Sequence, residues 1–435
     1  MDLLSSAFKI LEAIQQSSNP RKFVNEFVSY DNKKKELKIF DTRHNITGNL
    51  YILSVGKAAV SMTEALLEML KDNFDHGIIV IPHEYTFSNP KFEVYNSGHP
   101  LPDENGIIAS KKILSFVENT DINDTIICLI SGGGSALLPY PEDGLTLQDK
   151  IKTTELLLKC GAKIEEINTV RKHLSKIKGG KLAEKANGTL LTLVLSDVPA
   201  GSTTCIASGP TVADPTTFKD AFEILSKYNL LEFIPKNVLN HIKKGENGLI
   251  EESPKQVDTR HKTYIIGSNV YLLEAILRQT KKEGFNSMLL TSTMEGEARE
   301  IAHLLASISK EIKHFERPIQ KPAAIICGGE TTVTVNGKGK GGRNQEAALS
   351  FLIDVKGIEE LLILTYATDG RDGQTDAAGA IATGQTYFKA IKNGLNPVEF
   401  LQNNDSYTFF DRMNLLIKTG PTHTNLNDIF LILIN

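Results

Sequence analysis

Short apolar runs alternate with helix-like stretches along most of this 435-residue chain, and this alternation constrains the fold more than any other feature. Residues 125–130 (TIICLI) form one such run and residues 190–195 (LLTLVL) form another. Strands that are apolar throughout are buried on both faces, and the helices between them cover those faces of a parallel sheet. The sequence therefore predicts an α/β protein with a parallel sheet between two layers of helices.

A polar stretch at residues 244–262, which contains glycine and proline, separates two series of these elements. We expect a first domain over residues 1–250 and a second α/β domain over residues 260–435. A final strand at residues 429–434 could belong to either sheet. Within the second series, residues 323–327 and 331–335 are predicted to pair as a hairpin across the two glycines at 328 and 329.

Polar residues follow several of these strands at the point where each strand ends. They lie at residues 56–57, 131–135, 196–197, 328–330 and 368–370. In a doubly wound sheet, ligands bind at the carboxyl ends of the strands. The pattern predicts a ligand site to which both halves of the chain contribute, in a cleft between two domains.

Two glycine-rich loops are candidate anion sites. The first comprises Ser131, Gly132, Gly133, Gly134 and Ser135, and the second covers residues 337–342, with Gly339, Gly341 and Gly342 just before Arg343 and Asn344. Glycine lets the backbone approach a ligand, and a helix N-terminus behind such a loop favours negative charge. The alternative is that each loop is a tight turn, the second one with exposed cations.

Further cations strengthen the prediction of an anionic ligand. Lys57 follows a strand end, at the start of a helix, where it could neutralise a transferring phosphoryl group. Residues 171–181 (RKHLSKIKGGK) are strongly basic, and Arg171 and Lys178 are candidate ligands for phosphate or substrate. A solvated helix face is an equally good interpretation of that basic run.

Three carboxylates are candidate magnesium ligands, because Mg²⁺ in phosphoryl transfer is held by one or two carboxylates together with phosphates and water. They are Asp197, Glu330 and Asp369, each near the end of a predicted strand. Helix caps and turns are the alternative roles for the aspartates.

Composition excludes several classes of partner. The net charge of −4 argues against a nucleic-acid or anionic-membrane surface, and no apolar run is long enough to span a bilayer. The four cysteines match no zinc pattern or disulfide framework, and the N-terminus has no signal-peptide pattern, so we expect a cytoplasmic protein. The oligomeric state stays open, with a homodimer as one candidate.

Taken together, these motifs resemble the glycerate 2-kinase family, whose C-terminal region is called the MOFRL domain. The matching stretches run in family order: 54–59 (SVGKAA), 131–137 (SGGGSAL), 178–183 (KGGKLA), 196–198 (SDV), 207–211 (ASGPT), 328–335 (GGETTVTV), 341–346 (GGRNQE), 367–373 (ATDGRDG) and 420–428 (GPTHTNLND).

The resemblance implies ATP-dependent phosphorylation of D-glycerate at O2 with a divalent metal such as Mg²⁺. It also implies a Rossmann-like N-terminal domain and a smaller C-terminal α/β domain. The family's catalytic lysine and arginine fall on Lys57 and Arg343. Asp197 would bind Mg²⁺ or accept the hydroxyl proton, and both roles stay open.

Two other functions compete with this one. A reductase of hydroxypyruvate or tartronate semialdehyde is disfavoured, because no strand is followed by the Gly-x-Gly-x-x-Gly pattern of dinucleotide-binding folds. A non-catalytic sensor of sugar phosphates or nucleotides could use the same loops, and it would bind ligand without turnover.

Overall fold

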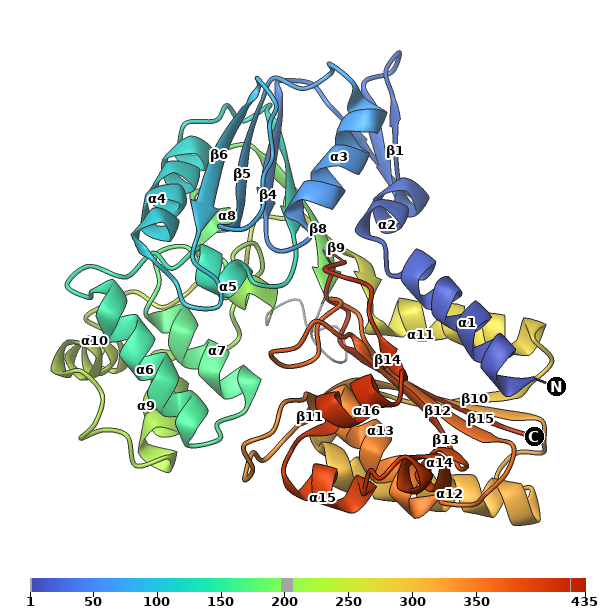
Figure 1. Cartoon of the computed structure of the whole chain (residues 1–435). Helices are drawn as coiled ribbons and strands as arrows, with labels where there is room; N and C mark the ends of the chain where they lie inside the picture. The colour runs from blue at the N-terminus through green and yellow to red at the C-terminus, as the bar shows by residue number, and fades with distance from the viewer. Residues whose placement is uncertain (1, 197–205, 423) are drawn as a thin grey trace. The chain divides into compact units, whose positions relative to one another are not determined.

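The computed structural model describes residues 2–196, 206–422 and 424–435, and the chain folds into two compact units (Figure 1). Of the described residues, 20–196 and 206–266 form the first unit, and 2–19 and 267–435 form the second. The N-terminal helix therefore belongs to the same unit as the C-terminal part of the chain, from residue 267 onwards.

The first unit is built on a six-stranded sheet with the order β6-β5-β4-β7-β8-β9. Its strands are β4 (Leu50–Val55), β5 (His76–Pro82), β6 (Phe92–Ser97), β7 (Thr125–Ile130), β8 (Thr189–Ser196) and β9 (Lys262–Ser268). The pairs β4–β5, β5–β6, β4–β7 and β7–β8 are parallel, as the apolar runs predicted. A small antiparallel sheet precedes it and comprises β1 (Val28–Asp31), β2 (Glu36–Ile39) and β3 (Thr42–Asn45).

Helices cover the six-stranded sheet and extend into a helical subcluster. They are α2 (Pro20–Phe27), α3 (Ala59–Leu70), α4 (Glu104–Glu118), α5 (Gly134–Leu137), α6 (Leu147–Lys159), α7 (Ile164–His173), α8 (Lys181–Lys185), the 3₁₀ turn η2 (Ile206–Ser208), α9 (Phe218–Lys227) and α10 (Lys236–Glu246). One core lies between the sheet and α4 and α8, and a second core joins α6, α7, α9 and α10. Helix α6 begins with a capping box between Thr146 and Asp149, which satisfies amides of its first turn.

The second unit contains a mixed sheet with the order β10-β11-β15-β12-β13-β14, in which β10–β11 is parallel and the other four pairs are antiparallel. Its strands are β10 (Asn286–Glu297), β11 (Ala323–Thr332), β12 (Leu361–Ala367), β13 (Gly379–Thr383), β14 (Leu416–Ile417) and β15 (Asp428–Ile434). The last strand, whose sheet the sequence left open, is fully buried between β11 and β12.

Helices lie on both faces of this mixed sheet (Figure 1). One face is covered by α1 (Leu3–Ser17) and α11 (Asn269–Lys282). The other is covered by α12 (Ala298–Phe315), α13 (Arg343–Asp354), α14 (Thr386–Lys392), α15 (Pro397–Gln402) and α16 (Ser406–Arg412). Both units are thus α/β layers, and the expected fold class is confirmed.

The predicted hairpin at residues 323–335 is wrong. Residues 323–332 form one continuous strand, β11, and Gly328 and Gly329 pair with Ile429 and Asp428 of β15. A Cβ atom at Gly329 would collide with the main chain of Met294 on the neighbouring strand, and φ at Gly329 is +155°. These glycines therefore allow a close approach of backbones inside a sheet. In the sequence, two adjacent glycines with this role look the same as two glycines in a turn.

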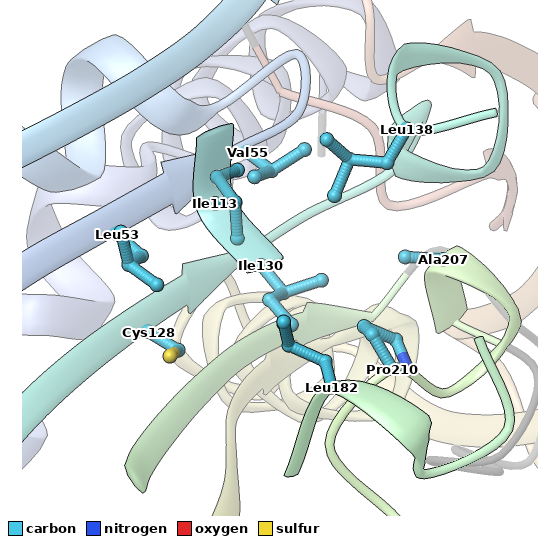
Figure 2. Close-up of a pocket in the computed structure, with 9 residues that line it drawn as sticks. All are labelled: Leu53, Val55, Ile113, Cys128, Ile130, Leu138, Leu182, Ala207 and Pro210. Atoms are coloured by element: carbon cyan, nitrogen blue, oxygen red, sulfur yellow. The ribbon is translucent and has the colours of Figure 1, made fainter. Parts of the chain in front are cut away.

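A small void lies in the core of the first unit, and Figure 2 shows the apolar side chains from β4, β7, α4 and α8 that surround it. Its volume is about 20 Å³, and it is lined by Leu53, Val55, Ile113, Cys128, Ile130, Leu138, Leu182, Ala207 and Pro210. A space that holds about one water molecule and offers no polar partner stays dry. We therefore treat it as a packing gap and not as a ligand site.

Candidate functional site

The glycine-rich turn after β7 joins the carboxyl ends of two adjacent strands. The amide of Lys57, which follows β4, donates to the carbonyl oxygen of Gly132 (2.9 Å), and the amide of Ala58 donates to Oγ of Ser131 (3.0 Å). Gly56 has φ of +128°, and a Cβ atom there would collide with Ser131. Glycine is therefore required at position 56, and the turn fixes the position of the Lys57 backbone.

Lys57, His99 and Gly133 lie next to one another at this edge of the sheet. A Cβ atom at Gly133 would lie 3.0 Å from Cδ2 of His99 and 3.5 Å from Cγ of Lys57, and φ at Gly133 is +90°. Burial and the neighbouring charge of Lys57 lower the pKa of His99 to about 4, so the imidazole is neutral at pH 7. The amides of Gly132 and Gly133 donate to no other residue that the structure describes, which leaves donors at the turn for an anion.

A cavity of about 420 Å³ opens beside this turn, within the first unit. His99, Gly133 and Ser135 line it together with three cationic side chains, which are Lys150 from α6, Arg171 from α7 and Lys178. The remaining lining is largely apolar and comprises Pro100, Leu101, Pro102, Ala136, Pro139, Ile151, Thr154, Glu155 and Leu158. A concave, mostly apolar site with a few convergent polar groups is typical of small-molecule binding.

Two of these cations are buried at a cost. Lys178 is 2% exposed, its Nζ donates to the carbonyl oxygen of Ala207 (3.2 Å), and burial together with Arg171 lowers its pKa to about 7. Lys150 is 7% exposed, and its pKa is far below the usual value because of burial first and Lys178 second. Buried like charges without a counter-ion favour the binding of an anion between them.

This cavity brings together Gly133, Ser135, Arg171 and Lys178, all of which were predicted from the sequence. Lys57 adjoins it through Gly133, whereas the sequence did not single out Lys150 at all. Lys150 shares the buried face of α6 with Thr153 and Leu157. A lysine at the helical spacing of buried residues was therefore the sequence feature that could have identified it. His99, which was not among the site residues predicted from the sequence, also lies in the cavity wall.

In the second unit, Arg343 is the first residue of α13 and forms two ion pairs. Its Nη1 donates to Oε1 of Glu330 (2.8 Å), and its Nε lies 2.6 Å from Oδ2 of Asp428. Asp428 is 1% exposed, whereas Glu330 is largely exposed. Asp428 and Glu330 raise the pKa of Arg343, so its charge is secure.

The glycine-rich loop before Arg343 uses its amides within the unit. The amides of Asn336 and Gly337 donate to Oδ1 of Asn404 (2.9 Å each), and that of Lys340 donates to Oδ1 of Asp405 (2.9 Å). The amide of Gly339 donates to a main-chain carbonyl oxygen, that of Asn403 (2.9 Å). These contacts give the loop a structural role.

The N-terminus of α13 is also occupied by a side chain. The carboxylate of Asp372 accepts from the amides of Asn344 (3.0 Å) and Gln345 (2.8 Å), and a Cβ atom at Gly342 would collide with it. A Cβ atom at Gly339 or Gly341 would likewise collide, with Asp405 or Ser406. Phosphate binding by Gly339, Gly341, Gly342 and Asn344 stays a prediction.

Two of the three candidate metal ligands, Glu330 and Asp369, have partners within the described part of the chain. Glu330 pairs with Arg343, and Oδ1 of Asp369 accepts from the amide of Arg371 (3.1 Å) in a turn. Asp197 lies outside the described residues. Among the residues described, no three histidine, cysteine or acidic side chains are grouped so as to hold a metal ion. A Mg²⁺ ion held by one or two carboxylates together with phosphate oxygens would not need such a group.

The helices that the structure describes include none that is both long enough and apolar enough to cross a membrane. The fold is that of an α/β protein, and its cation-lined cavity is a candidate site for a small anionic ligand. Two family models match the chain: a domain of unknown function (DUF4147) over residues 6–243, and the MOFRL family over residues 323–428.

Several proteins of assigned function are similar to this chain over most of its length. A glycerate 2-kinase from Pyrococcus horikoshii is 41% identical over all of this chain and 98% of its own. The crystal structure of a glycerate kinase from Thermotoga maritima is 38% identical, with a TM-score of 0.87 over 99% of both chains. A protein from Agrobacterium vitis, provisionally named a hydroxypyruvate reductase, is 38% identical over 89% of this chain and 87% of its own. The chain belongs to the glycerate kinase family.

Proposed function

We propose that this protein is an ATP-dependent glycerate 2-kinase, which transfers the γ-phosphoryl group of ATP to O2 of D-glycerate and releases ADP. The observation that carries the proposal is the cavity with three cationic side chains beside the glycine-rich turn of Lys57. Such a site suits a small carboxylic acid and a transferring phosphoryl group. The name of the full-length relative from Pyrococcus horikoshii supports the position of transfer.

The reaction needs positioning and neutralisation of charge more than covalent help. A bond forms between O2 of glycerate and the γ-phosphorus, the bond to the leaving oxygen of ADP breaks, and the hydroxyl proton leaves. Lys57 would neutralise charge on the moving phosphoryl group, and the amides of the 131–135 turn would donate to its oxygens. Arg343, held by Asp428, would be a second catalytic cation.

We propose ATP as the donor and Mg²⁺ as its accompanying cation. When bound, this cation would neutralise charge on the phosphate groups, and we assign no step to it. Asp197, Glu330 and Asp369 remain the proposed protein ligands, and Asp197 is also the proposed acceptor of the hydroxyl proton. Three free cysteines, Cys128, Cys160 and Cys327, support a place in the reducing cytoplasm. We further propose a homodimer, which light scattering of the purified protein would test.

The test is phosphorus NMR of the products formed from D-glycerate, ATP and Mg²⁺. We expect the signal of 2-phosphoglycerate together with ADP. A signal of 3-phosphoglycerate would keep the kinase and overturn the position of transfer. ADP and inorganic phosphate without phosphoglycerate would overturn the kinase proposal, and binding of glycerate or ATP without any turnover would favour a sensor.

A hydroxypyruvate reductase is the second candidate, and the name of the Agrobacterium vitis relative favours it. Strand β7 is followed by Ser131-Gly132-Gly133-Gly134-Ser135, and Leu137 stands where the dinucleotide fingerprint has its last glycine. We therefore expect that adding hydroxypyruvate causes no loss of the NADH or NADPH absorbance at about 340 nm, where the reduced nicotinamide absorbs. A steady loss that depends on the protein would favour the reductase.

A further inference from the structure

Lys150 is a buried cation for which the fold supplies no hydrogen-bonding partner. Its side chain is 7% exposed, and Nζ makes no hydrogen bond within the part of the chain that the structure describes. A buried ammonium group carries three donors, so leaving all of them unused is costly in the free protein. A ligand that supplies hydrogen-bond acceptors would offset this cost.

Helix α6 places Lys150 at the wall of the cavity. Four of its residues that also line the cavity, Ile151, Thr154, Glu155 and Leu158, follow Lys150 at helical spacing, so one face of the helix forms the wall. The capping box of Thr146 and Asp149 fixes the start of that helix one turn before Lys150. Lys150 is therefore held on a rigid element.

The charges around Lys150 are mostly positive. Arg171 and Lys178 line the same cavity, and both disfavour the charged form of Lys150. Glu142 is the acidic residue that acts on the charge of Lys150. It already has a partner, because Nζ of Lys181 lies 2.6 Å from its Oε1. Glu155, the acidic residue of the lining, is exposed. An incoming anion thus meets three basic side chains and little competing negative charge, and its arrival would favour their charged forms.

We infer that Lys150, together with Arg171 and Lys178, binds the carboxylate of the hydroxy-acid acceptor, and that Lys150 thereby makes the site selective for an acid over a neutral polyol. This inference rests on the proposed function. The apolar lining suits the short carbon chain of such an acid, and the cavity also borders Gly133, the neighbour of Lys57. A ligand with its carboxylate on the cations can thus direct its hydroxyl group towards that turn.

The decisive variant is Lys150→Met, which keeps an unbranched side chain one atom shorter and removes the amine. We expect the KM for D-glycerate to rise at least tenfold, with the KM for ATP within twofold of wild type. The ratio of kcat/KM for D-glycerate to that for glycerol, which lacks the carboxylate, should fall at least tenfold. Lys150→Arg should recover part of the affinity for D-glycerate, because it restores the charge.

Lys152→Met is the matched control, since Lys152 lies on the same helix, is exposed and does not line the cavity. It should leave both KM values unchanged. An unchanged KM for D-glycerate in folded Lys150→Met, as judged by its circular dichroism and melting curve, would overturn the inference. A raised KM for ATP with an unchanged KM for D-glycerate would also overturn it, in favour of a nucleotide phosphate as the anion.

Calorimetric titration with D-glycerate alone separates this inference from the kinase proposal. If wild type is a kinase and Lys150→Met binds D-glycerate as tightly as wild type, the inference fails by itself. If wild type forms no phosphoglycerate but binds D-glycerate, and Lys150→Met loses that binding by tenfold or more, the carboxylate site stands and the kinase proposal fails.

Discussion

The guanidinium group of Arg343 is anchored by Asp428, whose Oδ2 lies 2.6 Å from Nε of the arginine. Asp428 begins β15 and pairs with Gly329 of β11 on one side and Ala367 of β12 on the other. An aspartate at the middle of a sheet can move little, so it fixes the direction of the arginine it binds. Arg343 is thus oriented by a residue of a central strand of the second unit.

We predict that Asp428→Asn lowers kcat by ~10-fold to ~100-fold, because a small displacement of a catalytic cation is costly. The KM for D-glycerate should change less than threefold. Steady-state kinetics would check both values. Asp376→Asn, which removes a carboxylate from an exposed ion pair with Lys418, is the control and should behave like wild type. A kcat of Asp428→Asn equal to that of the control would show that Asp428 does not position Arg343.

Lys57→Ala and Arg343→Ala should each lower kcat by ~10²-fold or more, in line with the loss of one electrostatic contact in a transition state. Rapid-quench measurement of phosphoglycerate formation would separate this loss from slow product release. Turnover near that of wild type in either variant would remove that residue from the mechanism.

The pKa of Lys178, about 7, predicts a descending limb in the pH dependence of kcat/KM for D-glycerate. Lysine carries its charge below its pKa, so the anion site weakens as pH rises through neutrality. We expect kcat/KM to fall between pH 7 and pH 9 (roughly the range in which a group with such a pKa loses its proton). Lys178→Arg should lack this limb, because guanidinium stays charged. The same limb in the arginine variant would assign it to another group.

Lys150→Met should unfold at a higher temperature than wild type in the absence of ligand. Removal of an unpartnered buried charge is expected to stabilise the protein by about 1–3 kcal/mol. The lowered pKa of Lys150 means that the folded state binds fewer protons than the unfolded state, so wild-type stability rises with pH up to the ordinary value of 10.5. The stability advantage of Lys150→Met should therefore be largest at acidic pH and shrink as pH rises, which urea denaturation at several pH values would show. A variant less stable than wild type would contradict this account.

Asn404→Ala should destabilise the second unit by about 2–4 kcal/mol, because several buried groups lose their partner. Asn404 is 4% exposed, accepts from the amides of Asn336 and Gly337, and donates to Oε2 of Glu346 (3.0 Å). Asn404→Asp keeps the acceptors but places a carboxylate against Glu346, so it should be as destabilising at neutral pH and less so in acid. Equal stability of wild type and Asn404→Ala in urea would show that the loop does not depend on this anchor.

The sequence was most informative where local pattern and burial agree. The run at residues 125–130 became β7 with the same bounds, and the glycine-rich turn after it forms part of the cavity wall. Arg171 and Lys178 were equally compatible with a solvated helix face, and only the packing of the chain shows that both line the cavity. That they bind a ligand stays a prediction. A basic run alone does not reveal which of its members are buried.

Contacts between distant segments explain what the sequence could not supply. The glycines of residues 337–342 suggest an anion loop, yet several of them are needed because Asp372, Asp405 and Ser406 pack against them. Asp428 and Asp372 were not singled out, since each acts on a helix start at least 27 residues away along the chain. Contacts of this kind can be identified only in the folded structure, where the sheet brings the ends of its strands together.

The central place of β15 has a consequence for how the protein is made. Strands β11 and β12 both precede it in the chain, yet each pairs with β15. During translation, the edge of each strand that faces β15 therefore stays unpaired until residues 428–434 have left the ribosome. Unpaired apolar strand edges invite association with other chains. The nascent second unit should accordingly depend on chaperones, and a premature stop codon before residue 428 should yield aggregated protein instead of a shortened enzyme.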